Sequence, residues 1–157
     1  LFFEPKALYQ AACEVPDEMY TIPFGKAAFV REGDDVTVVA FGQMVGRAAA
    51  AIDALEALGI SCDLIDPRTS SPLDEDAILE SVEATGRLIV IDESPPRCGL
   101  TADIAGLAAD RAFHALKAPI KQVCAPHSPT PFAPELEAAY LPSVERIKAT
   151  IQQLLQA

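Results

Sequence analysis

The stretch Gly59-Ile-Ser-Cys-Asp-Leu-Ile-Asp-Pro-Arg-Thr-Ser-Ser-Pro-Leu-Asp74 decides the fold. Its first residue, a glycine, can close a helix because it adopts the left-handed conformation without a Cβ clash. Leu64 and Ile65 form the apolar body of a strand, which Pro67 ends because proline has no N–H for the ladder. Pro72 and the acidic residues behind it begin the next helix, where carboxylates meet the positive end of the helix dipole. Helix, strand, loop and helix form the repeating unit of a parallel sheet.

The same unit repeats along most of the chain. The apolar run 36–41 is nearly uninterrupted, which indicates a strand covered on both faces. Apolar stripes at helical spacing alternate with such strands. A short helix is expected around residues 7–13, and a short helical turn follows the proline-rich stretch 126–134. The main strands are expected at 26–31, 36–41, 61–66, 88–91 and 120–124, and the main helices at 44–58, 74–85, 101–116 and after the N-cap Ser143.

This alternation predicts an α/β fold, a three-layer α/β/α sandwich around a mostly parallel sheet of about five strands. The strand 26–31 joins its neighbour through a tight turn, so we expect one antiparallel edge strand. Residues 25–157 form the domain, and residues 1–24 form a connecting segment between domains. The chain opens on Leu1-Phe2-Phe3 without an initiator methionine, which indicates a fragment of a longer polypeptide.

Composition excludes several classes of function. The chain has 157 residues, which predicts one domain, and its net charge is −11. Nucleic acids and anionic membranes both require a basic face, so neither is an expected partner. No apolar run reaches the roughly 20 residues that span a bilayer.

The four cysteines predict neither a metal site nor a disulfide framework. Cys13, Cys62, Cys98 and Cys124 contain no C-x-x-C pair, so the spacing that zinc requires is missing. Cys62 and Cys124 lie in apolar strand patterns and are expected to be buried, reduced thiols. Reduced thiols indicate a cytoplasmic location.

Ligands in parallel α/β folds bind beyond the carboxyl ends of the strands, so candidate catalytic residues are expected there. Asp92 and Glu93 follow one strand but point to opposite faces, which favours helix capping or pairing with Arg68 over acid–base catalysis. His127 and Ser128 are neighbours in sequence, and neighbours rarely have the geometry of a nucleophile and its base. No catalytic residue is predicted.

Two strand-to-helix turns lie where an anion could bind. The turn Gly42–Gly46 lacks the glycine spacing of a nucleotide-binding loop, and close packing of helix on sheet explains Gly46 equally well. In the second turn, Arg97, Gly99 and Thr101 precede a helix, whose N-terminus can hold an anion with help from the guanidinium. These three residues form the candidate anion site.

Several motifs together resemble one known family. The chain is similar to the carboxyl-terminal domain of transketolase-type enzymes, and more narrowly to the beta subunit of the thiamine-diphosphate-dependent first component of 2-oxoacid dehydrogenase complexes. The sequence of the segment Asp92–Cys98 is most similar to the corresponding segment of acetoin dehydrogenase beta subunits. The motifs that carry the resemblance are Phe2–Tyr9, Ile65–Asp74, Thr85–Arg87, Ala118-Pro119 and Pro129–Phe132.

The resemblance implies an assembly role. In that family, thiamine diphosphate and Mg lie between the alpha subunit and the amino-terminal domain of the beta subunit, which also carries the catalytic residues. These 157 residues should therefore bind no cofactor or metal alone. The implied partners are the alpha subunit, a second beta subunit of a heterotetramer, and the acyltransferase core.

The resemblance also points to two candidate docking residues. Some relatives carry an aspartate before the Ala-Pro pair, and it helps to hold the basic domain of the acyltransferase. This chain has Lys117 there, and a cation cannot accept hydrogen bonds from a basic partner. The terminal carboxylate of Ala157 could participate instead. The alternative hypothesis is a stand-alone regulatory or anion-binding α/β domain, which would use the loops Asp66–Thr69 and Arg97–Thr101 to hold an anion.

Overall fold

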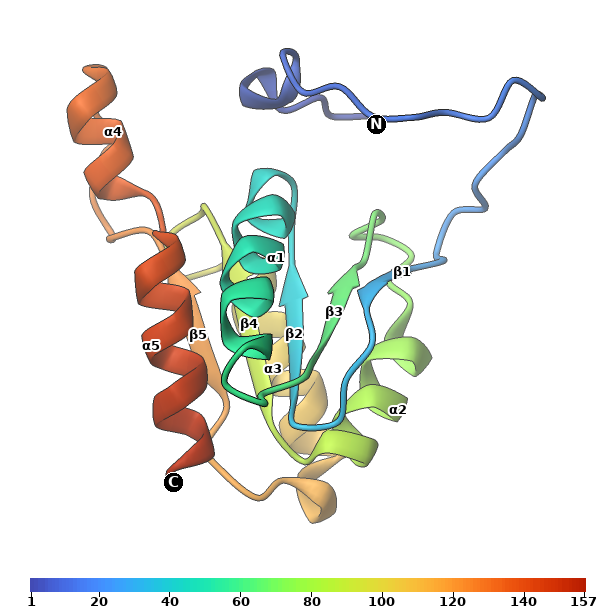
Figure 1. Ribbon diagram of the computed structural model, residues 1–157, viewed down its shortest axis with the longest axis vertical. Helices are drawn as coiled ribbons and strands as arrows, with labels where there is room; N and C mark the ends of the chain where they lie inside the picture. Colours follow the sequence, from blue (N-terminus) through green and yellow to red (C-terminus); the bar gives the residue numbers. More distant parts are fainter.

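A five-stranded sheet forms the centre of the computed structural model, which describes residues 1–157 (Figure 1). Its strands are β1 Ala28–Arg31, β2 Val36–Ala40, β3 Cys62–Asp66, β4 Leu88–Asp92 and β5 Lys121–Cys124. They lie side by side in the order β1-β3-β2-β4-β5. β3, β2, β4 and β5 are parallel, and β1 is antiparallel to β3. The predicted mostly parallel sheet is confirmed.

Helices cover both faces of the sheet and complete the three predicted layers. α1 and α5 pack on one face, and α2 and α3 pack on the other (Figure 1). α4 projects beyond the carboxyl ends of the strands. The helix bounds are α1 Gln43–Glu56, α2 Glu75–Thr85, α3 Leu100–Arg111, α4 Pro134–Tyr140 and α5 Val144–Leu155, with short 3-10 turns η1 Lys6–Leu8 and η2 Phe113–Ala115.

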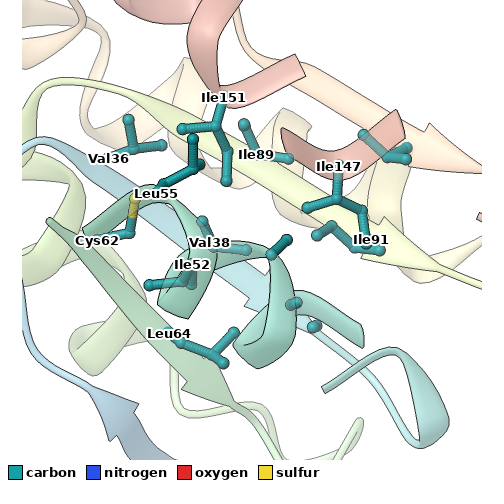
Figure 2. Packing of buried hydrophobic residues seen from close by; sticks show 14 of the residues in the cluster. Val36, Val38, Ile52, Leu55, Cys62, Leu64, Ile89, Ile91, Ile147 and Ile151 are labelled. Carbon is teal, nitrogen blue, oxygen red and sulfur yellow. The ribbon is translucent and has the colours of Figure 1, made fainter. Parts of the chain in front are cut away.

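The core divides into two aliphatic clusters because side chains alternate across the sheet. Val38 joins the cluster beneath α1 and α5, and Val39 joins the one beneath α2 and α3. Figure 2 shows the first cluster, where Ile147 and Ile151 of α5 pack near Ile89 and Ile91 of β4. Every residue of β2 and of β4 is buried, as the uninterrupted apolar runs predict.

Helix ends confirm the chemistry expected from the sequence. Gly59 and Gly86 both take φ of +76° just after α1 and α2. The backbone N–H of Gly86 donates to the Val82 carbonyl, which closes α2 in the left-handed cap that glycine allows. At the other kind of end, the Ser143 hydroxyl accepts a hydrogen bond from the Arg146 backbone N–H and caps α5.

The partner of the edge strand differs from the sequence prediction. A tight turn suggested that β1 pairs with the strand that follows it, but β1 instead pairs with β3, with Phe29 opposite Ile65. The turn is held away from hairpin geometry because the Gly33 N–H donates to the Asp63 carboxylate and the Asp35 N–H to the Ser61 carbonyl. β3 therefore lies between β1 and β2.

The third helix is shorter than predicted. α3 ends at Arg111, and η2 replaces the expected last turn up to residue 116. Ala112 leaves the helical region with φ of −119°, and the chain then turns toward α2. This turn lets the Lys117 backbone N–H donate to the Gly86 carbonyl, a contact that a straight helix would prevent. The early helix around 7–13 is also shorter, since only η1 forms there.

Residues 1–24 form an extended arm. The arm crosses above the carboxyl ends of the strands, in blue at the top of Figure 1. Its side chains are exposed except for Pro5, which is half-buried. The arm joins the domain where the Gly25 N–H donates to the Thr69 hydroxyl at 3.3 Å and the Ala27 N–H donates to the Asp74 carboxylate at 2.9 Å.

Candidate functional site

The carboxyl edge of the sheet carries a small polar cleft. The cleft has a volume of ≈ 300 Å³, at the lower end of the range for ligand pockets, and lies between η1, the start of α1, the end of β4 and α4. Lys6, Gln43, Glu93, Thr130 and Glu137 supply its polar groups, with apolar walls from Pro5, Ala7, Tyr140 and Leu141. None of the predicted anion-site or docking residues lines this cleft, whereas Glu93, for which the sequence favoured a structural role, does.

The two carboxylates at the carboxyl end of β4, Asp92 in the strand and Glu93 just after it, have separate partners. Asp92 is buried and accepts a hydrogen bond from the Ser94 hydroxyl. Glu93 accepts one from the Gln43 side chain at the start of α1. Neither pairs with Arg68, whose own backbone N–H donates to the Asp66 carboxylate at 3.0 Å. The predicted helix cap and the predicted pairing with Arg68 are therefore wrong, because Asp92 is bound by the Ser94 hydroxyl and Glu93 by the Gln43 side chain.

His127 and Ser128 do not form a catalytic pair. His127 is exposed and makes no hydrogen bond. The Ser128 carbonyl accepts a hydrogen bond from the Tyr140 hydroxyl, at 3.1 Å. That contact ties α4 to the loop after β5. The arrangement supports a structural role for the loop.

The three candidate anion-site residues differ in their exposure to solvent and in their hydrogen-bond partners. Thr101 is fully buried, and its hydroxyl donates to the Gln122 side chain at 3.1 Å and lies 3.4 Å from the Cys124 sulfur. Gly99 precedes α3 in an extended conformation. Arg97 is exposed and makes no ion pair. The Thr101 hydroxyl therefore faces β5, and only Arg97 and the backbone of Gly99 are available to an anion.

The docking candidates lie at the opposite, amino edge of the sheet. Lys117 follows η2 and lines an apolar groove of ≈ 420 Å³. Its ammonium donates to the Thr85 carbonyl at 3.0 Å, at the carboxyl end of α2. Ala157 ends the chain after α5 at this same edge, at the bottom of Figure 1. The other residues of the groove are Ala109, Phe113, Leu116, Ala118, Pro119 and Ile120.

The sequence analysis missed a buried polar cluster at this edge. The Thr37 hydroxyl lies 2.7 Å from the Ser81 hydroxyl and 2.8 Å from the Thr85 hydroxyl. Ser81 in turn donates to the Asp63 carboxylate. A threonine inside the valine-rich run of β2 was the available signal, since a buried hydroxyl requires a partner. The cluster joins three elements and carries no nucleophile exposed to a substrate.

The cysteines are free, as predicted. Cys62 and Cys124 are buried, and Cys13 and Cys98 are exposed. Burial, with smaller contributions from the Asp35 and Asp63 carboxylates, raises the pKa of the Cys62 thiol to about 12. Burial also raises the pKa of Cys124. Both buried thiols are therefore protonated near neutral pH and are poor nucleophiles.

The structure contains no cluster of side chains that could bind a metal ion. No three His, Cys, Asp or Glu side chains come together in metal-binding geometry. None of the helices has the length and apolar character needed to cross a membrane.

Comparison with known proteins identifies the class. The profile described as "Transketolase, C-terminal domain" matches residues 25–147, and the chain belongs to this family. Its similarity extends to particular beta subunits of oxidoreductases. It is 51% identical, over 98% of this chain and 45% of the relative, to "Acetoin:2,6-dichlorophenolindophenol oxidoreductase subunit beta" of Bacillus subtilis (strain 168). The resemblance to acetoin and 2-oxoacid dehydrogenase beta subunits is thereby confirmed.

Further relatives support the same placement. "Pyruvate dehydrogenase E1 component subunit beta" of Bacillus subtilis (strain 168) is 41% identical over 99% of this chain and 48% of the relative. A solved structure, "Split gene transketolase, inactive beta4 tetramer", superposes with a TM-score of 0.77 at 26% identity, over 87% of this chain and 44% of that one. The chain spans a little under half the length of the curated relatives it matches.

Proposed function

We propose that this chain is the C-terminal assembly domain of the beta subunit of a thiamine-diphosphate-dependent dehydrogenase that acts on acetoin or a 2-oxoacid. The observation that carries the proposal is the similarity to the acetoin oxidoreductase beta subunit over 98% of the chain. The domain holds subunits together, and the catalytic residues of the enzyme lie outside these 157 residues.

The placement of the reactive side chains supports an assembly role. Glu93 is engaged with Gln43, Asp92 with Ser94, and Thr101 with Gln122. His127 has no partner that could activate it or be activated by it. A general acid, base or nucleophile needs such a partner within hydrogen-bond reach. These hydrogen bonds hold loops and helix ends in place, which supports an assembly role for the domain.

Thiamine diphosphate and Mg do not fit the residues of this chain. A Mg-bound diphosphate requires converging oxygen ligands and a phosphate-binding turn. The side chains here form no metal-ligand group, and the Gly42–Gly46 turn lacks a nucleotide-binding glycine pattern. We propose that the cofactor and metal belong to the assembled parent enzyme and to parts of it other than this domain.

The proposed partners are an alpha subunit, a second beta subunit and the acyltransferase core. The groove along η2 and Lys117 is our candidate surface for the acyltransferase, because it combines apolar walls with one cation. A cation there favours a partner segment that presents carboxylates. We propose a cytoplasmic location, since Cys62 and Cys124 are free thiols and the cytoplasm keeps thiols reduced.

A domain exchange tests the proposal. The matching carboxyl-terminal part of the Bacillus subtilis acetoin oxidoreductase beta subunit is replaced by this chain, and the chimera is produced with the alpha subunit of that enzyme. We expect a purified complex that reduces dichlorophenolindophenol in the presence of acetoin. A folded chimera that does not bind the alpha subunit would contradict the proposal. The 157-residue chain alone is the control and should show no reduction.

A further inference from the structure

The polar cleft at the carboxyl edge lies where the chain changes its direction across the sheet. β2 and β4 are neighbours, with β3 beyond β2 and β5 beyond β4. The loop after β2 leads to α1 on one face of the sheet, whereas the loop after β4 leads to α3 on the other. Neighbouring parallel strands whose loops leave toward opposite faces open a crevice between them, and α/β proteins bind ligands in such crevices. Gln43 and Glu93, the first residues after these loops begin, both line the cleft.

A distant segment of the chain forms another wall of the cleft. Pro5 and Lys6 of the arm line it together with Glu137 and Tyr140 of α4. In Figure 1 the turn η1 lies over the start of α1. The volume of ≈ 300 Å³ is at the lower end of the range for ligand pockets. The space therefore suits a small molecule.

The polar groups of the cleft are mostly hydrogen-bond acceptors. The Gln43 side-chain amide donates to one oxygen of Glu93, which leaves the Gln43 carbonyl oxygen and the second Glu93 oxygen as acceptors. The Glu137 carboxylate is exposed and forms no ion pair. Two carboxylates and an amide oxygen around one small space match a ligand that donates hydrogen bonds and carries a positive charge.

Lys6 is the one cation that lines the cleft, and it does not neutralise these carboxylates. Its ammonium forms no salt bridge with Glu93 or Glu137. Two carboxylates against one ammonium leave the lining with an excess of negative charge, which disfavours an anion. A metal ion is also a poor fit, because no three His, Cys, Asp or Glu side chains come together.

We infer that this cleft binds a small primary amine in its ammonium form. The three N–H groups of the ammonium can donate to Glu93, to Glu137 and to the Gln43 carbonyl oxygen. The hydrocarbon part of the amine packs against the apolar walls, to which Pro5 and Leu141 contribute. The inference goes beyond the proposed assembly role and does not depend on it, because every residue that it uses belongs to this chain.

Backbone amide chemical shifts of the full 157-residue chain, isotopically labelled, test the inference. The probe is n-butylammonium chloride, titrated at constant ionic strength and near neutral pH, where the amine is protonated. We expect saturable shifts at the amides around Gln43, Glu93, Thr130 and Glu137. Sodium butyrate and n-butanol share the butyl chain but lack the ammonium, so neither should give saturable shifts at these amides.

Substitution of the two carboxylates assigns the binding to the cleft. Glu93→Gln keeps an oxygen that can accept from Gln43, and Glu137 is exposed, so both variants should keep the fold. Each of Glu93→Gln and Glu137→Gln should weaken the binding of butylammonium by about threefold, and the double variant by about tenfold. Glu135→Gln is the matched control, because Glu135 lies in α4 but does not line the cleft, and it should leave the affinity unchanged.

Lys6 provides a test of opposite sign. Lys6→Gln removes a like charge from the cleft, so it should strengthen the binding of butylammonium, by about twofold. Absence of saturable shifts, or equal shifts with n-butanol or butyrate, would overturn the inference. A double variant that binds butylammonium as tightly as the wild type, or a Lys6→Gln chain that binds it more weakly, would overturn it too. The domain exchange measures association with the alpha subunit instead, so the two proposals can fail independently.

Discussion

The ammonium of Lys117 donates a hydrogen bond to the backbone carbonyl of Thr85, at 3.0 Å. This carbonyl lies in the last turn of α2, where the helix dipole places its negative end. The Lys117 stem also lies over Gly86, the residue that closes the helix. Lys117 therefore holds α2 to the segment before β5.

This contact predicts a loss of stability when Lys117 is shortened. Lys117→Ala removes a cation at a helix end and the hydrocarbon stem over Gly86, which should cost about 1 kcal/mol and lower Tm by about 2–4 °C. Lys117→Met keeps much of the stem and should lose less. Differential scanning calorimetry of the three chains measures both effects. Equal Tm values for wild type and Lys117→Ala would show that the contact is not stabilising.

Gly86 itself cannot carry a side chain without a rearrangement. A Cβ there would lie 2.7 Å from Lys117 Cδ and 2.9 Å from the Ala115 carbonyl oxygen, and its φ is +76°. We expect Gly86→Ala to destabilise the fold by at least about 1–2 kcal/mol, because the strained φ and the backbone clash add. Urea unfolding provides the measurement.

The matched control for Gly86 is another glycine of the same domain. Gly46 lies inside α1, and a Cβ built there meets nothing within 4 Å. Gly46→Ala should therefore stabilise the chain by about 0.5–1 kcal/mol, because alanine loses less entropy in a helix. A Gly86→Ala chain as stable as the Gly46→Ala chain would contradict this account of the helix end.

These local features explain which parts of the fold the sequence predicts well. Gly59 and Gly86 end helices by their own backbone freedom, and the apolar run 36–41 must be covered on both faces, so both were predictable. The pairing of β1 with β3 depends on Asp63, a residue far from the turn in sequence, which accepts from Gly33. The early end of α3 depends in the same way on Gly86. The hydrophobic periodicity of a sequence does not show which distant segments contact one another, so these two features could not be predicted from it.

The candidate sites show the same division. Side chains of adjacent strand residues point apart, which predicted that Asp92 and Glu93 would not share one site, and each has its own partner. The partners themselves, Ser94 and Gln43, required the structure. The direction of the Thr101 hydroxyl also required it, because a threonine near a helix start can face either the helix end or the neighbouring strand.

The buried hydroxyl of Thr37 predicts a cost for replacing it with an apolar side chain of similar shape. Thr37→Val leaves the Ser81 and Thr85 hydroxyls with one partner fewer inside the protein. We expect a loss of about 1–3 kcal/mol in the free energy of unfolding. Thr150→Val is the control, because Thr150 is only half-buried and its hydroxyl donates to the Arg146 carbonyl of its own helix, so the substitution should change stability by less than about 0.5 kcal/mol. Equal effects of the two substitutions would argue against a stabilising buried cluster.

The anion hypothesis makes a prediction that depends on Arg97. Arg97 is exposed, and Gly99 offers only its backbone beside the start of α3, so inorganic phosphate should raise Tm only weakly and only while the guanidinium is present. Thermal unfolding with phosphate, compared with chloride at equal ionic strength, measures the difference. Arg97→Ala should abolish it, whereas Arg111→Ala, which removes a cation from the far end of α3, should not. A phosphate effect that both variants retain would place the anion elsewhere.

The raised pKa of Cys62 predicts how stability changes in alkaline solution. The pKa of this thiol is about 12 in the fold, compared with an ordinary value of 9.0, because burial disfavours the thiolate. Between these two values the unfolded chain has lost the proton and the folded chain keeps it. Stability from this group is therefore complete below pH 9.0 and falls as the pH rises toward about 12. The slope of the free energy of unfolding should be about 1.4 kcal/mol per pH unit for one such group.

Urea unfolding at a series of alkaline pH values measures this slope, and Cys62→Ala should reduce it. Cys98→Ala is the control, because Cys98 is exposed and its loss should leave the pH dependence unchanged. A thiol reagent gives an independent test at neutral pH. Cys13 and Cys98 should react quickly, and Cys62 and Cys124 only after unfolding, because a buried protonated thiol is neither accessible nor nucleophilic. Rapid reaction of all four thiols in the folded chain would show that the core around Cys62 opens far more often than its packing implies.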